Sequence, residues 1–373
     1  MGIYKIGVLL GDDIGLEIVP QAVAALSSAA EVTPGLDLDF IDLPIGAAAY
    51  KATGHTLPPG TLERLAEFDG WILGPIGHAA YPREDSNAFN PHPVIRRHFD
   101  LYANIRPARS LPGVKALHDG VDLVIVRENN EGMQPDRNMH KGSGEFMPTP
   151  DMALATRVIT RRGSERIARA AFDLARDRGE ARRAAGQHHP AGPRPRVTII
   201  HKRTVFKLSC GLFVDTAREV AGEYPDIDVD EHQVDSFAAA VAMKPQRFDT
   251  IVVTNMFGDI LSDLAAGLVG GLGLAPGLNA GDRYAMAQAT HGSAPDIAGK
   301  NIANPYAIVI SAEMLLEWLG RRHTDKAALS AASRIERAVH RVIADGTRTR
   351  DMGGEATTEE FGSAVVKKIK EGE

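Results

Sequence analysis

The 373-residue chain has a single cysteine and no long hydrophobic run, and each shortage excludes a class of protein. With Cys210 alone, no disulfide can form within the chain and no zinc site can be built from cysteines. Residues 264–278, the longest apolar passage, contain five glycines and a proline. They fall short of the roughly 18 to 20 apolar residues that a membrane-spanning helix requires. The first ten residues lack the apolar core and cleavage site of a signal peptide, so we expect a cytoplasmic protein.

An excess of positive charge is also absent. The chain has 42 basic and 48 acidic residues and a formal net charge of −6, whereas general nucleic-acid binding requires a strong positive field. We therefore expect no nucleic-acid partner. The proportions of hydrophobic (44%) and charged (24%) residues are those of an ordinary globular protein of one or two domains.

Short apolar runs alternate with segments of helical periodicity along most of the chain, and this alternation predicts an α/β fold. The expected strands are residues 3–10, 36–40, 71–76, 121–126, 197–200, 227–230 and 250–254. The expected helices are residues 16–29, 204–220, 237–243, 307–319, 326–344 and 358–369. Residues 179–196 are rich in Gly, Pro and Arg and predict a surface loop. The adjacent His188 and His189 in this loop could bind a metal, but without acidic or thiol neighbours a solvated loop is favoured.

The glycine fingerprint of a Rossmann dinucleotide site is missing, because Gly11-Asp-Asp-Ile-Gly15 has the wrong spacing. Another loop, His291-Gly-Ser-Ala-Pro-Asp296, consists mostly of small residues whose backbone amides can approach a phosphate closely. Asp296 could accept hydrogen bonds from ribose hydroxyls. An acidic residue there favours NAD over NADP, because it repels a 2′-phosphate.

Two aspartates, Asp259 and Asp263, follow an expected strand and lie four residues apart where a helix should begin. This spacing places both carboxylates on one helical face, which suits a hard cation such as Mg²⁺ or Mn²⁺. Two carboxylates need a further ligand, and Asp235 is our candidate. The competing interpretation is that these are unrelated surface acids.

Arginine and lysine side chains supply the charges that an anionic substrate needs. Arg96, Arg106 and Arg127 lie beside expected apolar segments, and guanidinium groups bind carboxylates in a bidentate manner. Lys202 follows the expected strand 197–200, and a lysine beside other cations can serve as a general base. Read one at a time, each of these residues is also compatible with an ordinary surface charge.

Taken together, these segments resemble the metal-dependent β-decarboxylating dehydrogenases of 2-hydroxy acids. That family includes isocitrate, 3-isopropylmalate, homoisocitrate, tartrate and D-malate dehydrogenases. The resemblance extends over nearly the whole chain. It depends on the motifs Gly11-Asp-Asp-Ile-Gly-Leu-Glu17, Asp100-Leu-Tyr-Ala-Asn-Ile-Arg-Pro107, Val126-Arg-Glu-Asn-Asn-Glu-Gly132, His201-Lys202, Val234-Asp235, Asn255-Met-Phe-Gly-Asp-Ile-Leu-Ser-Asp263 and the segment from His291 to Asn304.

The resemblance implies an α/β fold of two domains, like that of isopropylmalate dehydrogenase, with an open mixed sheet and a non-Rossmann dinucleotide site. Residues 1–101 and 270–373 would form the cofactor-binding domain. Residues 102–269 would form the domain for substrate, metal and dimerisation, with an arm at about residues 136–150 that clasps the partner of a homodimer.

The resemblance also implies roles for individual residues. Asp259 and Asp263 would bind Mg²⁺ or Mn²⁺ together with Asp235 of the partner subunit, which would also supply the catalytic Lys202. The substrate, a hydroxy-di- or tricarboxylate, would be held by Arg96, Arg106 and Arg127. NAD would be held by His291, Gly292, Ser293, Ala294, Asp296, Ile297 and Asn304. The implied reaction is oxidation of a 3-substituted (2R)-malate, followed by decarboxylation.

Some positions depart from the family pattern. Gln134 stands in place of a tyrosine and cannot act as a proton-donating acid. Thr204 replaces an asparagine, Gln288 a glutamate and Asp13 a glycine, which affects the expected cofactor geometry. In the segment that selects the substrate, Asn90 and His92 favour a polar 3-substituent, although His92 could equally face water.

Two alternatives remain beside the decarboxylating enzyme, and the first of them follows from Gln134. One is a family member that binds a malate-like acid, or oxidises it without decarboxylation. The other is a distantly related phosphohydroxythreonine-type dehydrogenase with a histidine-based metal site, whose signature is not evident. The sequence leaves the 3-substituent, the pathway, the proton donor to the enolate and any assembly beyond a dimer open.

Overall fold

The computed structural model describes residues 3–134 and 139–372 and divides them into two compact units. The first unit comprises Met1–Leu101, Leu111–Ala116 and Gly270–Glu373, and the second comprises Tyr102–Ser110 and Leu117–Val269. The sequence placed the domain boundaries after residues 101 and 269. It placed residues 111–116 in the second domain, whereas they belong to the first unit. The functions expected of the two domains remain predictions.

The first unit contains a mainly parallel group of strands in the order β2-β1-β3-β12-β11. Their bounds are β1 Ile3–Leu9, β2 Asp37–Asp42, β3 Gly70–Leu73, β11 Leu278–Ala280 and β12 Ala285–Ala287. β1 pairs in parallel with β2 and β3, β3 pairs in parallel with β12, and β11 and β12 are antiparallel. The chain therefore returns to this unit at Gly270 and adds its last strands beside β3.

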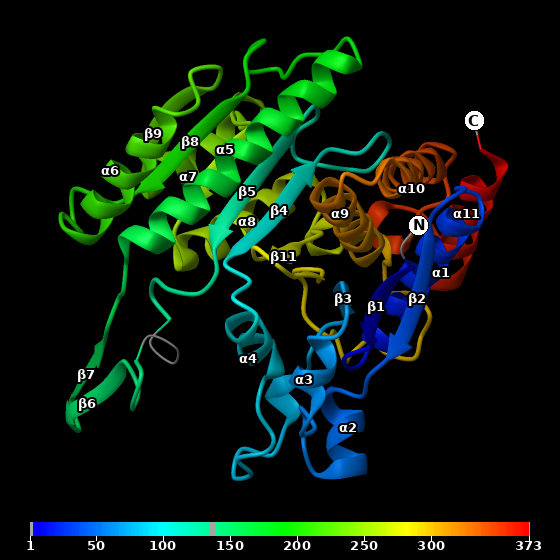
Figure 1. Cartoon of the computed structure of the whole chain (residues 1–373), viewed down its shortest axis with the longest axis horizontal. Coiled ribbons are helices and arrows are strands. Elements are labelled where there is room, and N and C mark those ends of the chain that lie inside the picture. Colours follow the sequence, from blue (N-terminus) through cyan, green and yellow to red (C-terminus); the bar gives the residue numbers. More distant parts are fainter. Residues whose placement is uncertain (1–2, 135–138, 373) are drawn as a thin grey trace. The chain divides into compact units, whose positions relative to one another are not determined.

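Helices of the first unit come from both ends of the chain (Figure 1). They are α1 Gly15–Glu31, α2 Gly46–Thr53, α3 Thr61–Leu65, α4 Pro91–His98, α9 Tyr306–His323, α10 Lys326–Ala344 and α11 Thr358–Glu371. Short 3₁₀ turns lie at His78–Ala80, Leu272–Leu274 and Arg350–Met352. A core cluster around Trp71, Phe99 and Met286 packs α4 on these strands and fixes the position of its polar side chains.

The second unit has strands in the order β4-β5-β10-β8-β9, of which only β4 and β5 are antiparallel to each other. The strand bounds are β4 Ala103–Arg109, β5 Asp122–Glu128, β8 Arg196–His201, β9 Asp228–Gln233 and β10 Thr250–Val253. The helices are α5 Arg161–Ala184, α6 Ser209–Ala221, α7 Val234–Met243 and α8 Asn255–Val269, with a 3₁₀ turn at Pro245–Arg247. These mostly parallel strands and their helices confirm the predicted α/β fold class.

Residues of one strand alternate between two cores, as the pleat of a strand requires. Val252 of β10 packs with Phe172 of α5 and Phe213 of α6, whereas Ile251 and Val253 pack with residues of α7 and α8. Helices therefore cover both faces of this sheet, and its parallel strands are apolar on both sides (Figure 1).

A separate hairpin pairs β6, Glu145–Thr149, with β7, Met152–Ala155 (Figure 1). All of its residues are exposed, including Phe146, Met147, Met152 and Leu154. It falls partly within the predicted dimer arm, residues 136–150, of which residues 136–138 lie outside the described residues. Its role as an arm remains a prediction.

The largest differences from the expected boundaries lie at the start of α6 and at the end of α5. α6 begins at Ser209, because residues 202–208 form turns after β8. The expected loop 179–196 begins too early, since α5 continues to Ala184. His189 in this loop is buried, which corrects the expectation of a wholly solvated segment.

Candidate functional site

The aspartates Asp259 and Asp263 occupy the first turns of α8, directly after β10. Their side chains are about half exposed (51% and 55%), so both carboxylates are open to solvent on one helical face. Burial is the largest cause that raises the pKa of Asp263 above its ordinary value, and the charge of Asp259 acts in the same direction. Two neighbouring carboxylates on one helical face suit a divalent cation, and a metal there fits these residues.

Two buried arginines donate hydrogen bonds to the Asp259 carboxylate. Arg127 Nη1 donates to Asp259 Oδ1 at 2.6 Å, and Arg106 Nη1 donates to the same oxygen at 3.0 Å. Arg106 also donates to Ser262 Oγ at 2.7 Å, and its Nη1 lies 3.8 Å from Asp263 Oδ1. Both guanidiniums come from neighbouring antiparallel strands, β4 and β5. The structure thus brings Arg106 and Arg127 to the predicted metal-binding aspartates.

Asn255 connects this group to Gln134. Its Oδ1 accepts hydrogen bonds from Arg127 Nη2 at 2.7 Å and from Gln134 Nε2 at 3.0 Å, and its backbone oxygen accepts from Arg127 Nε at 2.9 Å. Asn255 is fully buried, and its Nδ2 has no hydrogen-bond partner among the described residues. This role was not predicted from the sequence, in which Asn255 marked only the beginning of a motif. The Gln134 side chain is therefore held by the buried Asn255 amide, and it cannot itself donate a proton as an acid.

Lys202 and Asp235 form a second pair in the same unit, at the end of β8 and in the first turn of α7. Lys202 Nζ lies 2.6 Å from Asp235 Oδ1, and this hydrogen bond is the first cause that lowers the pKa of Asp235. Within residues 3–134 and 139–372 no three His, Cys, Asp or Glu side chains come together as a metal site. Asp235 therefore does not join Asp259 and Asp263 inside one chain.

Predicted substrate residues of the first unit gather on α4. Arg96 Nη2 donates to Gln288 Oε1 at 2.7 Å, and the amide nitrogen of Gln288 lies beside the His92 ring. Asn90 has a structural role, because its Oδ1 accepts from His92 N at 3.0 Å and caps the helix. Burial, followed by the charge of Arg96, lowers the pKa of His92 to about 3, so its ring is neutral near pH 7.

The predicted cofactor loop is anchored to the N-terminal motif. Ile14 N donates to Ser293 O at 3.2 Å, and the Glu17 carboxylate accepts from the backbone N–H groups of Gly299 and Asn301. Asn304 Nδ2 donates to Asp351 Oδ2 at 2.9 Å, a contact that the sequence analysis did not foresee. The loop is thereby held at both ends.

The interior of this loop has features that fit a nucleotide. The buried Nε2 of His291 has no partner among the described residues, and burial lowers the pKa of this histidine. A Cβ added to Gly292 would meet nothing within 4 Å, so the backbone there is open to a ligand. The side chain of Asp296 is exposed, as ribose recognition requires, whereas Ala294 and Ile297 are partly exposed. An unpaired imidazole nitrogen beside an open backbone fits the predicted dinucleotide.

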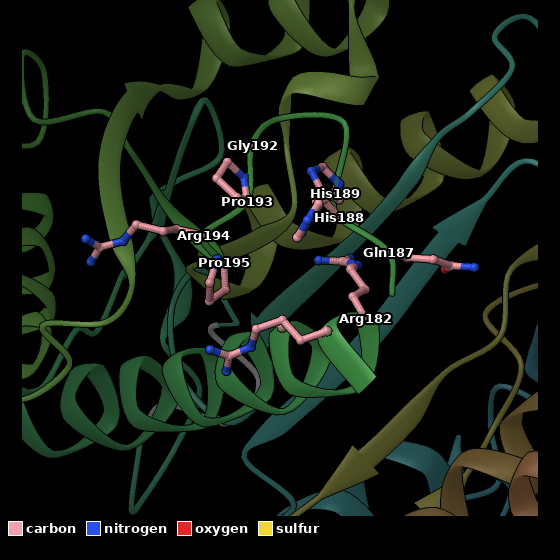
Figure 2. Close-up of a pocket in the computed structure, with 10 residues that line it drawn as sticks. Arg182, Gln187, His188, His189, Gly192, Pro193, Arg194 and Pro195 are labelled. Carbon is pink, nitrogen blue, oxygen red and sulfur yellow. The ribbon is translucent and has the colours of Figure 1, made fainter. Parts of the chain in front are cut away.

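A hollow between α5 and the loop before β8 offers no metal site (Figure 2). It is lined mainly by Arg182, Arg183, Arg194 and the two adjacent histidines. His189 uses both ring nitrogens, since Nε2 lies 3.0 Å from Asp122 O and Nδ1 accepts from Ala191 N at 3.0 Å. His189 therefore fixes the loop and has no ring nitrogen left to bind a metal.

Comparison with known proteins identifies relatives over almost the full length. A family model described as isocitrate/isopropylmalate dehydrogenase matches residues 5–365. The isocitrate/homoisocitrate dehydrogenase of Thermus thermophilus is 43% identical over 98% of this chain and 99% of its own length. The 3-isopropylmalate dehydrogenase of Methanothermobacter thermautotrophicus is 40% identical over the same shares of the two chains. The crystal structure of isocitrate dehydrogenase from Methylococcus capsulatus superposes with a TM-score of 0.81 at 38% identity, covering 98% of this chain and 99% of that one.

Among the described residues, every helix is too short or too polar to cross a membrane.

Proposed function

Because the chain belongs to the isocitrate/isopropylmalate dehydrogenase family and is an oxidoreductase that acts on CH–OH groups, we propose that it oxidises and decarboxylates a 3-substituted (2R)-malate. The hydride acceptor is NAD and the metal is Mg²⁺ or Mn²⁺. The observation that carries the proposal is the contact of two buried arginines with Asp259, which presents paired carboxylates beside paired guanidiniums. A metal-bound hydroxycarboxylate needs both kinds of group.

In this proposal Arg96, Arg106 and Arg127 bind the carboxylates of the substrate. The aspartates Asp259 and Asp263 of one subunit and Asp235 of the partner subunit hold the cation. When bound, the cation would supply a Lewis acid for the substrate oxygen and NAD would supply an acceptor for the hydride at C2. The loop that contains His291, Gly292, Ser293, Ala294, Asp296, Ile297 and Asn304 binds the adenosine half of NAD.

Proton transfer is assigned to Lys202, whose Nζ takes the proton of the substrate hydroxyl as the C2 hydrogen leaves. Its partner Asp235 orients the amine through their 2.6 Å contact. Gln134 cannot return a proton to C3 as an acid, so we assign that step to water. The buried Asn255 amide holds the Gln134 side chain in position for this water.

A homodimer follows from the same proposal, since Lys202 and Asp235 come from the subunit opposite Asp259. The exposed apolar side chains of the β6–β7 hairpin suit a contact with a second copy. The isopropylmalate and homoisocitrate enzymes among the relatives leave the 3-substituent undecided, and the side chains near Arg96 favour a polar one.

The test is to follow NADH formation at 340 nm with Mg²⁺ and a panel of 3-substituted (2R)-malates, while released CO₂ is measured in the same reaction. We expect equal amounts of NADH and CO₂. NADH without CO₂ would show oxidation alone, the alternative left open by Gln134. Binding of a malate without NADH formation would show a catalytically inactive family member.

A further inference from the structure

The side chain of Gln288 is the centre of a polar cluster in the first unit, directly after β12. It is 5% exposed, and its Oε1 accepts from Arg96 Nη2 at 2.7 Å and from Asn279 Nδ2 at 3.2 Å. Its Nε2 lies 2.9 Å from Nδ1 and 3.0 Å from Nε2 of His92. One amide thus connects Arg96, which binds a substrate carboxylate in our proposal, with His92, which the sequence predicts to lie near the 3-substituent.

The amide matches what its neighbours need. Arg96 and Asn279 both donate, so they require an oxygen acceptor on one side. The neutral His92 ring has one unprotonated nitrogen, which requires a donor on the other side. Glutamine supplies both at once, whereas a carboxylate has no hydrogen to donate.

The amide also brings no charge. A glutamate at position 288 would place a negative charge within hydrogen-bond distance of the Arg96 guanidinium, about 3 Å away, where Coulomb attraction is strong even with partial screening. Glutamine holds the guanidinium in place through one hydrogen bond and leaves its positive charge undiminished by residue 288. The electrostatic potential around Arg96 is therefore more positive with glutamine at position 288 than it would be with glutamate.

We propose that Gln288 is a specificity-determining positioning residue, which fixes Arg96 and His92 on α4 and, by being uncharged, favours substrates with a further carboxylate in the 3-substituent over those with an alkyl group. The inference rests on the proposed function, because it takes Arg96 and His92 as substrate-binding residues. Gln288 acts through these two side chains and needs no contact with the substrate.

Two substitutions separate charge from position. Gln288→Glu keeps the acceptor for Arg96 but adds a negative charge, so we expect kcat/KM to fall at least about 10-fold more for a 3-carboxyalkyl malate than for a 3-alkyl malate, mainly through KM. Gln288→Met removes the hydrogen bonds without adding charge and should lower kcat/KM for both substrates by similar factors. Gln187→Glu, on an exposed loop, is the control for the added charge itself.

Equilibrium binding makes the test independent of turnover. The affinities of tricarballylate, a tricarboxylate, and glutarate, a dicarboxylate, are measured by calorimetry for the wild type and the three variants, with folding checked by circular dichroism. If the wild type turns over no malate but Gln288→Glu still weakens tricarballylate selectively, the proposed function fails and the inference stands. Equal effects of Gln288→Glu on both anions, or unchanged binding by Gln288→Met, would overturn it.

Discussion

Lys202 Nζ lies 2.6 Å from Oδ1 of Asp235, although Lys202 directly follows β8 and Asp235 lies in the first turn of α7. The proposed base and one proposed metal ligand are therefore adjacent in a single chain, and the other two ligands belong to α8. A subunit that supplies one of the pair to its partner's site must supply both. This relationship makes the proposed mechanism testable one residue at a time.

Replacement of Lys202 by Met should lower kcat by about 10²- to 10⁴-fold, because the proton acceptor for the substrate hydroxyl is lost. The rate of NADH formation at saturating substrate measures the effect. Lys207→Met removes an exposed lysine five positions away and should leave kcat unchanged. Equal rates for the two variants would show that Lys202 has no catalytic role.

Replacement of Asp259 by Asn should weaken Mn²⁺ binding and lower activity by about 100-fold or more, since one anionic oxygen ligand becomes a neutral amide. Electron paramagnetic resonance of free Mn²⁺ gives the affinity, and the optical assay gives the rate. Asp119→Asn changes an acid in an exposed turn and should alter neither. Retention of wild-type Mn²⁺ affinity in Asp259→Asn would exclude this carboxylate as a ligand.

Mixing two inactive variants tests whether the site is shared between subunits. A heterodimer of Lys202→Met with Asp259→Asn should regain about half of the wild-type activity, because one of its two sites then has both native residues. The heterodimer is isolated with two different affinity tags. If both residues acted within one chain, the heterodimer would stay as inactive as its parents.

The Glu128 carboxyl should make stability depend on pH. Burial is the largest cause that raises its pKa from 4.5 to about 7, so the folded state binds a proton more tightly than the unfolded chain. Protonation of Glu128 in the folded state contributes up to about 3 kcal/mol to the free energy of unfolding. This contribution is complete below pH 4.5 and is lost as the pH rises toward 7. Urea denaturation of the wild type and Glu128→Gln at pH 5 and pH 8 measures it. The wild type should lose stability relative to the variant as the pH rises, and a constant difference would contradict this assignment.

Loss of a buried ion pair should cost far more than loss of an exposed one. Asp249 is fully buried, and its Oδ1 lies 3.2 Å from Arg178 and 2.9 Å from Arg182. Asp249→Ala leaves both guanidiniums without this partner and should lower the free energy of unfolding by about 3 to 5 kcal/mol. Asp226→Ala breaks an exposed ion pair with Arg176, which lies on α5 like Arg178 and Arg182. This substitution should lower the free energy of unfolding by less than about 1 kcal/mol. Similar midpoints of urea denaturation for the two variants would show that the buried network contributes little.

Sequence reasoning predicted the elements with strong periodicity and the residues carried by ordered motifs. The helices α1, α9, α10 and α11 were expected close to their observed bounds. β11 and β12 were missed because each has three residues, too few to show alternation. The partnership of Arg96 with Gln288 joins positions 192 residues apart and depends on which strands are neighbours, which one sequence does not reveal. Asn90 was expected to meet the substrate, but its position before Pro91 also marks it as a helix cap, a local signal that could have been used.

The division of the chain affects the order in which it folds during synthesis. Residues 117–269 of the second unit leave the ribosome as one stretch and can begin to pack, whereas the first unit must wait for its second half. β3 gains its neighbour β12 only after more than two hundred further residues have been translated, and α1 gains α11 more than three hundred residues after its own end. The nascent N-terminal third therefore exposes an unpaired strand edge for most of translation, and this segment is where we expect chaperones to bind.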